Sequence, residues 1–60
     1  MLFATDERNY YYELGVSRYD KGDIEKAILA WEKAIIVNPE FVEAYYNLGN
    51  AYEEKGLLEK

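Results

Sequence analysis

The chain has 60 residues, of which 50% are hydrophobic and 17% aromatic, and its formal net charge at pH 7 is −5. A chain this short forms at most one small domain, and it is too apolar to be a disordered tail. It contains no Cys and no His, which excludes disulfides, Cys-ligated metals and the commonest general base.

The same composition narrows the expected partners and location. The excess of acidic residues disfavours binding to phosphate backbones, so we expect no nucleic-acid partner. No apolar run approaches the ~18 residues that a membrane span needs, so we expect no membrane partner. A chain without Cys fits a reducing compartment, and we expect a cytoplasmic protein.

The first predicted helix spans residues 6–21. Thr5 or Asp6 can cap its free N–H groups. Gly22 should end it, because glycine adopts the left-handed backbone conformation without a Cβ clash. Its apolar side comprises Tyr11, Leu14, Gly15 and the stem of Arg18, and a second stripe comprises Tyr12, Val16 and Tyr19.

The second predicted helix spans residues 24–37 and follows a capping residue, Asp23. Its apolar surface is so wide that we expect other helices to cover more than one side. Pro39 should stop it, because proline cannot donate to the preceding turn. The apolar face comprises Ile24, Ala27, Ile28, Trp31, Ala34 and Ile35, widened by Leu29, Ala30, Ile36 and Val37.

The third predicted helix spans residues 40–55, with Asn38 as its cap and Pro39 at its first position. Gly56 should end it, and residues 57–60 should open a fourth helix. The short connections require antiparallel neighbours, and no segment favours a strand, so the predicted fold class is all-α. The apolar side of this helix comprises Phe41, Ala44, Tyr45, Leu48, Ala51 and Tyr52.

The sequence repeats itself at a spacing of 34 residues. Eight of the 16 residue pairs between 11–26 and 45–60 are identical, among them the Leu-Gly pairs at 14–15 and 48–49. A helix–turn–helix unit of this length, with small residues, aromatics and Pro39 in register, resembles the tetratricopeptide repeat. The resemblance divides the single unit 1–60 into a first repeat at about 8–41 and a half repeat at about 42–60. It has one departure, since Arg18 occupies the position of Tyr52.

The resemblance implies an antiparallel helix-turn-helix solenoid in which the first helix of each pair lines a groove for a peptide or helix of a partner protein. The implied groove residues are Asn9, Tyr12, Val16, Tyr19 and Asp20, followed by Glu43, Tyr46, Asn50, Glu53 and Glu54. A groove this acidic should prefer a neutral or basic segment. The carboxylate clamp of one family subtype is absent, because Tyr12 and Val16 replace its Lys and Asn.

Solenoid repeats cannot bury their apolar faces alone, and about three are usually needed for stability. We therefore expect either a homo-oligomer or a missing remainder. The copies could stack end to end, form a two-fold dimer or exchange helices about Gly22 or Asn38-Pro39. The expected self-association face comprises Leu48, Ala51, Tyr52, Leu57 and Leu58. The chain could be a truncated or designed piece of a longer array, or a short natural chain.

An enzyme is not expected. The candidate nucleophiles Thr5 and Ser17 have no His or Cys to activate them, and no loop matches a calcium or phosphate site, so we predict no cofactor and no metal. Two functions remain. One is an interaction module that binds a protein segment or another copy of itself, and the other is a purely structural self-assembly unit without a ligand.

Overall fold

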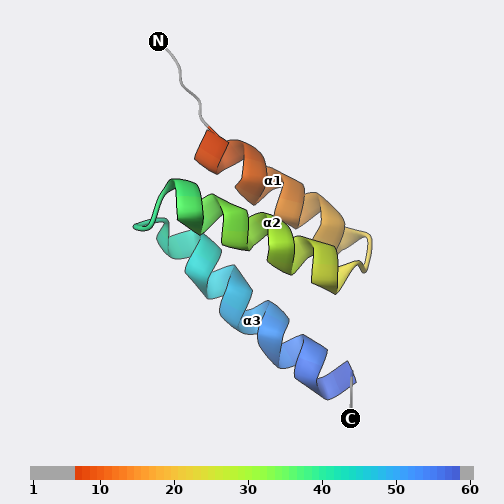
Figure 1. Ribbon diagram of the computed structural model, residues 1–60. Coiled ribbons are helices and arrows are strands. Elements are labelled where there is room, and N and C mark those ends of the chain that lie inside the picture. The colour runs from red at the N-terminus through yellow and green to blue at the C-terminus, as the bar shows by residue number, and fades with distance from the viewer. Residues whose placement is uncertain (1–6, 59–60) are drawn as a thin grey trace.

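The computed structural model describes residues 7–58, which form three α-helices (Figure 1). They are α1 (Glu7–Asp20), α2 (Ile24–Val37) and α3 (Val42–Leu58). Successive helices run antiparallel, and α2 packs against both α1 and α3. No strand occurs among these residues. The predicted all-α class and the antiparallel helix-turn-helix arrangement are confirmed.

The turn between α1 and α2 forms as predicted. Gly22 has a φ of 85°, in the left-handed region. Its N–H donates to the Tyr19 carbonyl and that of Asp23 to the Arg18 carbonyl, both at 2.9 Å. This pair of bonds satisfies carbonyls that the helix end would otherwise leave open. The Asp23 side chain then accepts a hydrogen bond from the Lys26 N–H at 3.2 Å, which caps α2.

The turn between α2 and α3 differs from the prediction. The Asn38 side chain accepts a bond from the Glu40 N–H at 3.4 Å, and the Phe41 N–H donates to the Asn38 carbonyl at 3.1 Å. These bonds close a turn over residues 38–41, so α3 begins at Val42 and not at residue 40. The Phe41 carbonyl accepts the first bonds of α3, and the expected cap at Asn38 with Pro39 at the first position is wrong.

The C-terminal end of α3 also differs. The helix continues through Gly56 to Leu58, so Gly56 does not end it. Gly22 alone among the described glycines has a positive φ. A glycine tolerates helical dihedrals as well as left-handed ones, and Gly56 keeps the helical ones. Residues 57 and 58 belong to α3, and the remainder of the expected fourth helix lies outside the described residues.

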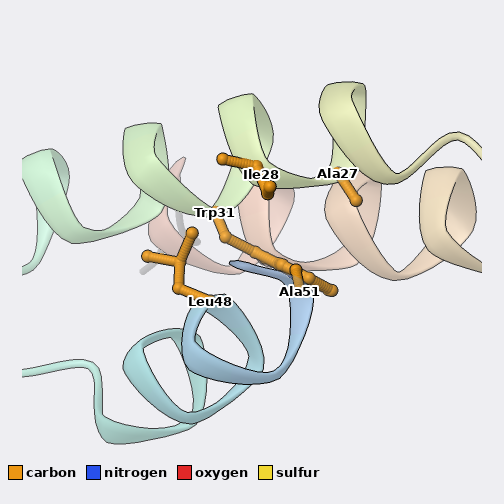
Figure 2. Close-up of a cluster of buried hydrophobic side chains, with 5 residues drawn as sticks. All are labelled: Ala27, Ile28, Trp31, Leu48 and Ala51. Atoms are coloured by element: carbon orange, nitrogen blue, oxygen red, sulfur yellow. The ribbon is translucent and has the colours of Figure 1, made fainter. Parts of the chain in front are cut away.

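The core lies where α2 meets its two neighbours. Trp31 is 2% exposed, and Figure 2 shows its ring against Leu48 and Ala51 of α3. Alanines on α2 and α3 keep the helices close enough for this ring to touch both sides. The buried apolar residues are Ala27, Ile28, Ala30, Trp31, Ala34, Ala44, Leu48 and Ala51. The wide face predicted for α2 is covered from two sides, although Leu29 and Ile36 stay exposed.

The two glycines at equivalent repeat positions have different surroundings. At Gly15, an added Cβ would collide with the Trp31 indole, so the absence of a side chain lets the indole reach the α1 backbone. At Gly49, an added Cβ would meet nothing within 4 Å. The close packing expected from the repeat pattern is therefore confirmed at Gly15, whereas the described part of the chain leaves Gly49 uncovered.

Candidate functional site

A cavity of about 190 Å³ opens between α1 and α3. Trp31 of α2 is almost fully buried beneath it and forms its floor. The residues that line the cavity are Val16, Tyr19, Trp31, Asn47 and Asn50. We call this cavity and the α1 and α3 surfaces beside it the groove.

Helical spacing brings the groove's side chains together. Tyr12, Val16 and Tyr19 recur at i, i+4 and i+7 on α1, so they share one face and pack against the core around Trp31. On α3, Asn47 and Asn50 are three residues apart and face α1 across the gap. The groove therefore has an aromatic and aliphatic wall on α1 and an amide wall on α3.

Hydrogen bonds tie the two walls together near Tyr12. The Trp31 Nε1–H donates to the Tyr12 carbonyl at 3.1 Å, which is possible because Gly15 lets the indole approach α1. The Tyr12 hydroxyl accepts a bond from Asn47 Nδ2 at 3.2 Å. The Tyr12 ring also lies 5.0 Å from that of Phe41, between ring centroids. These contacts fix the end of the groove nearest the N-terminus of α3.

The other end of the groove is closed by a tyrosine–carboxylate pair. The Tyr19 hydroxyl donates to Glu54 Oε1 at 2.7 Å. The hydrogen bond to Glu54 is the main cause of a raised pKa for Tyr19, with desolvation and the charges of Glu54 and Asp20 adding to it. A similar pair joins α2 to α3 elsewhere, where the Tyr52 hydroxyl donates to Glu32 at 2.5 Å and the pKa of Tyr52 is raised.

These two pairs predict a stability loss at alkaline pH. Because the folded chain raises both tyrosine pKa values above 10.0, it retains the protonated form better than the unfolded chain does. The stabilisation is complete below pH 10 and is lost as the pH rises through the raised values. In the Tyr19→Phe/Tyr52→Phe variant we expect a slightly lower Tm at pH 7 and a shallower fall of Tm above pH 10, both measured by circular dichroism.

Tyr46→Phe provides the control for this experiment, since Tyr46 is exposed and its hydroxyl has no hydrogen bond among the described residues. It should leave both the Tm at pH 7 and its alkaline dependence unchanged. Parallel Tm curves for the double variant and the original chain above pH 10 would contradict the assigned role of the two pairs.

The residues predicted for the groove are distributed unevenly around it. Val16, Tyr19 and Asn50 line the cavity, while Tyr12 and Glu54 hold its ends. The remaining predicted residues with described side chains are exposed and do not line it, and these are Asp20, Glu43, Tyr46 and Glu53. The side chain of Asn9 lies outside the described part of the structure.

Two lining residues, Asn47 and Trp31, are missing from the predicted groove set. The prediction took the groove residues of α3 as those 34 residues after the groove residues of α1, which assumes that both helices use the same face. The two helices lie on opposite sides of the cavity, however, so α3 lines it with a face that differs from the one α1 uses. Asn47 corresponds to Glu13, which is exposed on α1. Asn47 could have been found from its spacing, because it lies three residues before the predicted groove residue Asn50 and so on the same side of the helix.

Two residues of the predicted self-association face are buried in the core of the chain. Leu48 is 4% exposed and Ala51 fully buried, because both pack against Trp31 of the same chain. They therefore do not form a bare surface. Tyr52 is half exposed, and the side chains of Leu57 and Leu58 lie outside the described part of the structure. The apolar surface that α3 does expose comprises Val42, Tyr45, Tyr46 and Tyr52.

No group of three or more acidic residues in the described range is arranged to hold a metal ion. Within the same range, no helix has the length and apolar character needed to cross a membrane.

Comparison with known proteins decides the family. The model of the TPR repeat matches residues 15–56. The chain belongs to the tetratricopeptide repeat family. No solved structure matches.

Three relatives support the same family. The chain is 41% identical over 51 residues to the uncharacterized protein MJ0572 of Methanocaldococcus jannaschii, covering 85% of the chain and 59% of that protein. It is 40% identical over 53 residues to the chloroplastic tetratricopeptide repeat domain-containing protein PYG7 of Arabidopsis thaliana, covering 88% of the chain and 18% of that protein. It is 45% identical over 51 residues to the TPR repeat-containing protein MJ1428 of M. jannaschii, covering 85% of the chain and 9% of that protein.

The chain thus spans about three fifths of the first of these relatives and less than a fifth of the other two. Tetratricopeptide repeats are generally non-enzymatic, and membership of the family indicates a protein–protein interaction module.

Proposed function

We propose that the chain binds an extended peptide segment of another protein in the groove, with one apolar side chain in the cavity and a basic residue beside it. The observation that carries the proposal is a side-chain-sized cavity with an apolar floor, an amide wall and acidic surroundings. Each of these three features selects one property of the peptide.

The cavity selects an apolar side chain. Its volume of about 190 Å³ is comparable to cavities that accept a benzene ring, which are ~150 Å³. Val16 and the rings of Tyr19 and Trp31 supply apolar contacts. Fully burying a Leu, Ile or Met side chain contributes about 1.5–3 kcal/mol. One such anchor therefore suits the cavity, whereas a charged side chain would lose its hydration there.

The amide wall selects a peptide backbone. The Asn47 Nδ2 is engaged with Tyr12, which leaves the Asn47 side-chain carbonyl able to accept a second bond. Asn50 makes no side-chain hydrogen bond among the described residues, so both its donor and its acceptor are available. Because an amide matches both the N–H and the C=O of an extended chain, these two residues can hold the peptide beside its anchor.

The charge around the groove selects a basic neighbour for the anchor. Asp20 and Glu54 lie at the end of the groove near Tyr19, and Glu53 follows on α3. All three are exposed, so each contributes only a modest attraction that salt weakens. A Lys or Arg one or two residues from the anchor would approach these carboxylates, whereas a Glu there would be repelled.

The test compares synthetic peptides that carry a Leu flanked by Lys, a Leu flanked by Glu, and a Ser flanked by Lys. Fluorescence anisotropy should give the tightest binding for the first. Glu54→Gln should weaken that binding roughly twofold to fivefold at low salt, because an exposed charge pair contributes ~0.2–1 kcal/mol. The glutamine still accepts the Tyr19 hydroxyl, so the groove keeps its shape.

Glu40→Gln is the matched control, since it makes the same change of net charge in the exposed turn between α2 and α3. It should leave the affinity for the Leu–Lys peptide unchanged. Equal affinities for the three peptides, or equal losses in the two variants, would refute the proposed groove specificity.

A second candidate role is self-assembly. The observation that favours it is the apolar surface exposed by α3, where Val42, Tyr45 and Tyr52 are left open by the described chain. This surface differs from the groove, so a peptide and another copy could bind together.

A further inference from the structure

We propose that Tyr19 is a positioning residue for charge recognition in the groove, because its hydroxyl holds the Glu54 carboxylate beside the cavity, where it meets a cationic side chain of the bound peptide. This inference rests on the proposed function and deepens it. The groove then has two separable selectivities. The cavity selects the apolar anchor, and the Tyr19–Glu54 pair selects the charge of the residue next to it.

The ring of Tyr19 is anchored to the core. It is partly buried and packs against the buried cluster around Trp31, with the two ring centroids 5.8 Å apart. Trp31 is itself held by the hydrogen bond from its Nε1–H to the Tyr12 carbonyl at 3.1 Å. A tyrosine has only two side-chain torsions, so a fixed ring also fixes the place of its oxygen. The Tyr19 hydroxyl is therefore a fixed donor at the rim of the groove.

Glu54 depends on this donor for its position. Its side chain is exposed on α3, and an exposed glutamate otherwise keeps most of its rotamer freedom. The Tyr19 hydroxyl donates to Glu54 Oε1 at 2.7 Å, which joins residues 35 positions apart in the sequence. No Lys or Arg side chain in the described part of the chain forms an ion pair with Glu54. The bond from α1 therefore selects where the carboxylate lies.

The positioned carboxylate can still bind a ligand. A carboxylate has about four lone-pair sites on its two oxygens, and Tyr19 uses one of those on Oε1. Oε2 accepts no hydrogen bond from the described residues. A Lys or Arg of the peptide can therefore donate to Oε2 while Tyr19 stays bonded to Oε1. Such a charge-assisted bond does not require the peptide to displace the tyrosine.

The protonation state of Tyr19 suits this role. The hydrogen bond to Glu54 is the main cause of the raised pKa of Tyr19, and desolvation and the charges of Glu54 and Asp20 add to it. The hydroxyl is therefore a proton donor throughout the neutral range. Asp20 is exposed and adds negative charge at the same end of the groove.

Positioning should act in opposite directions on cationic and acidic peptides. A cationic peptide gains affinity because Glu54 is already ordered, so binding does not have to immobilise a flexible side chain. An acidic peptide loses affinity because the held carboxylate cannot swing away from it. Removal of the bond should therefore weaken the binding of the first peptide and strengthen that of the second. A general loss of structure would weaken both.

Tyr19→Phe tests this expectation, since it removes the hydroxyl and keeps the ring that lines the cavity. In fluorescence anisotropy at low salt, we expect the affinity for the Leu–Lys peptide to fall about twofold and that for the Leu–Glu peptide to rise by a similar factor. The ratio of affinities for the Leu–Lys and Ser–Lys peptides should not change, because both carry the Lys and the cavity keeps its apolar lining.

Tyr52→Phe is the matched control. The Tyr52 hydroxyl makes the same kind of bond to Glu32 at 2.5 Å, but it joins α3 to α2, and neither residue lines the cavity of the groove. Both variants should lower the Tm slightly. Only Tyr19→Phe should change the preference for Lys over Glu beside the anchor.

The double variant Tyr19→Phe/Glu54→Gln tests whether the hydroxyl acts through the carboxylate. Its affinity for the Leu–Lys peptide should equal that of Glu54→Gln alone, because a positioning residue has no effect once the charge that it positions is gone. A further loss in the double variant would mean that the hydroxyl contacts the peptide directly, and would overturn the positioning role.

The remaining outcomes separate this inference from the proposed function. An original chain that binds the Leu–Lys and Leu–Glu peptides equally would overturn both. A chain that prefers the Leu–Lys peptide, with a Tyr19→Phe variant that shifts both affinities in the same direction or neither, would overturn the role of Tyr19 alone and leave peptide binding in the groove intact.

Discussion

Replacing Trp31 with alanine is expected to unfold the chain. Trp31 is 2% exposed and contacts side chains of both α1 and α3, so one truncation removes the shared centre of the core. Removing a buried Trp costs about 3–5 kcal/mol. A small domain has about 5 kcal/mol of stability in total. Far-UV circular dichroism at 25 °C should show most of the helical signal lost.

Ile36→Ala is the control for this truncation, because Ile36 also lies on α2 but is largely exposed. It should change the free energy of unfolding by no more than ~0.5 kcal/mol. If the Trp31→Ala variant melted cooperatively within a few degrees of the original chain, the indole would not have the central role assigned to it.

The same substitution at the two equivalent glycines should have opposite effects. Gly15→Ala introduces a methyl group that collides with the Trp31 indole and pushes its N–H away from the Tyr12 carbonyl. Overpacking of this kind costs ~1–3 kcal/mol, only partly offset by the ~1 kcal/mol gain in helix propensity. Gly49→Ala meets nothing and should retain that gain in full. Urea unfolding at low protein concentration measures both changes.

Each glycine variant is the control for the other, since the chemical change and the repeat position are the same. Low concentration keeps the proposed self-assembly from contributing. Destabilisation by similar amounts at both sites would mean that glycine is needed for a reason other than contact with the indole.

The sequence predicts the helices well because helix-forming signals are local. Gly22 and Asp23 mark the first turn by backbone conformation and capping, and both act as expected. The same kind of signal failed at Gly56, where glycine remains helical and α3 continues. A glycine permits a helix to end without requiring it, so the outcome depends on the residues around it. The helix α3 begins two residues later than predicted, because the Asn38 side chain accepts a hydrogen bond from the Glu40 N–H within the preceding turn.

The groove was only partly predictable. Val16, Tyr19 and Asn50 were identified because the repeat register locates the helices that line it. Asn47 was missed because the register does not specify how two neighbouring helices rotate toward each other. Leu48 and Ala51 were expected on the self-association face, whereas the Trp31 ring covers them from within the chain. Such pairings depend on distances between helices, which side-chain patterns along one helix do not contain.

The central position of α2 has a consequence for local opening of the fold. Both outer helices pack mainly against α2, whereas α1 and α3 touch each other directly at fewer points, among them Tyr12 with Asn47 and Tyr19 with Glu54. Either outer helix can therefore detach transiently while the remaining antiparallel pair stays assembled. The chain has two routes of partial opening that share one helix, and the backbone amides of α2 stay protected in both.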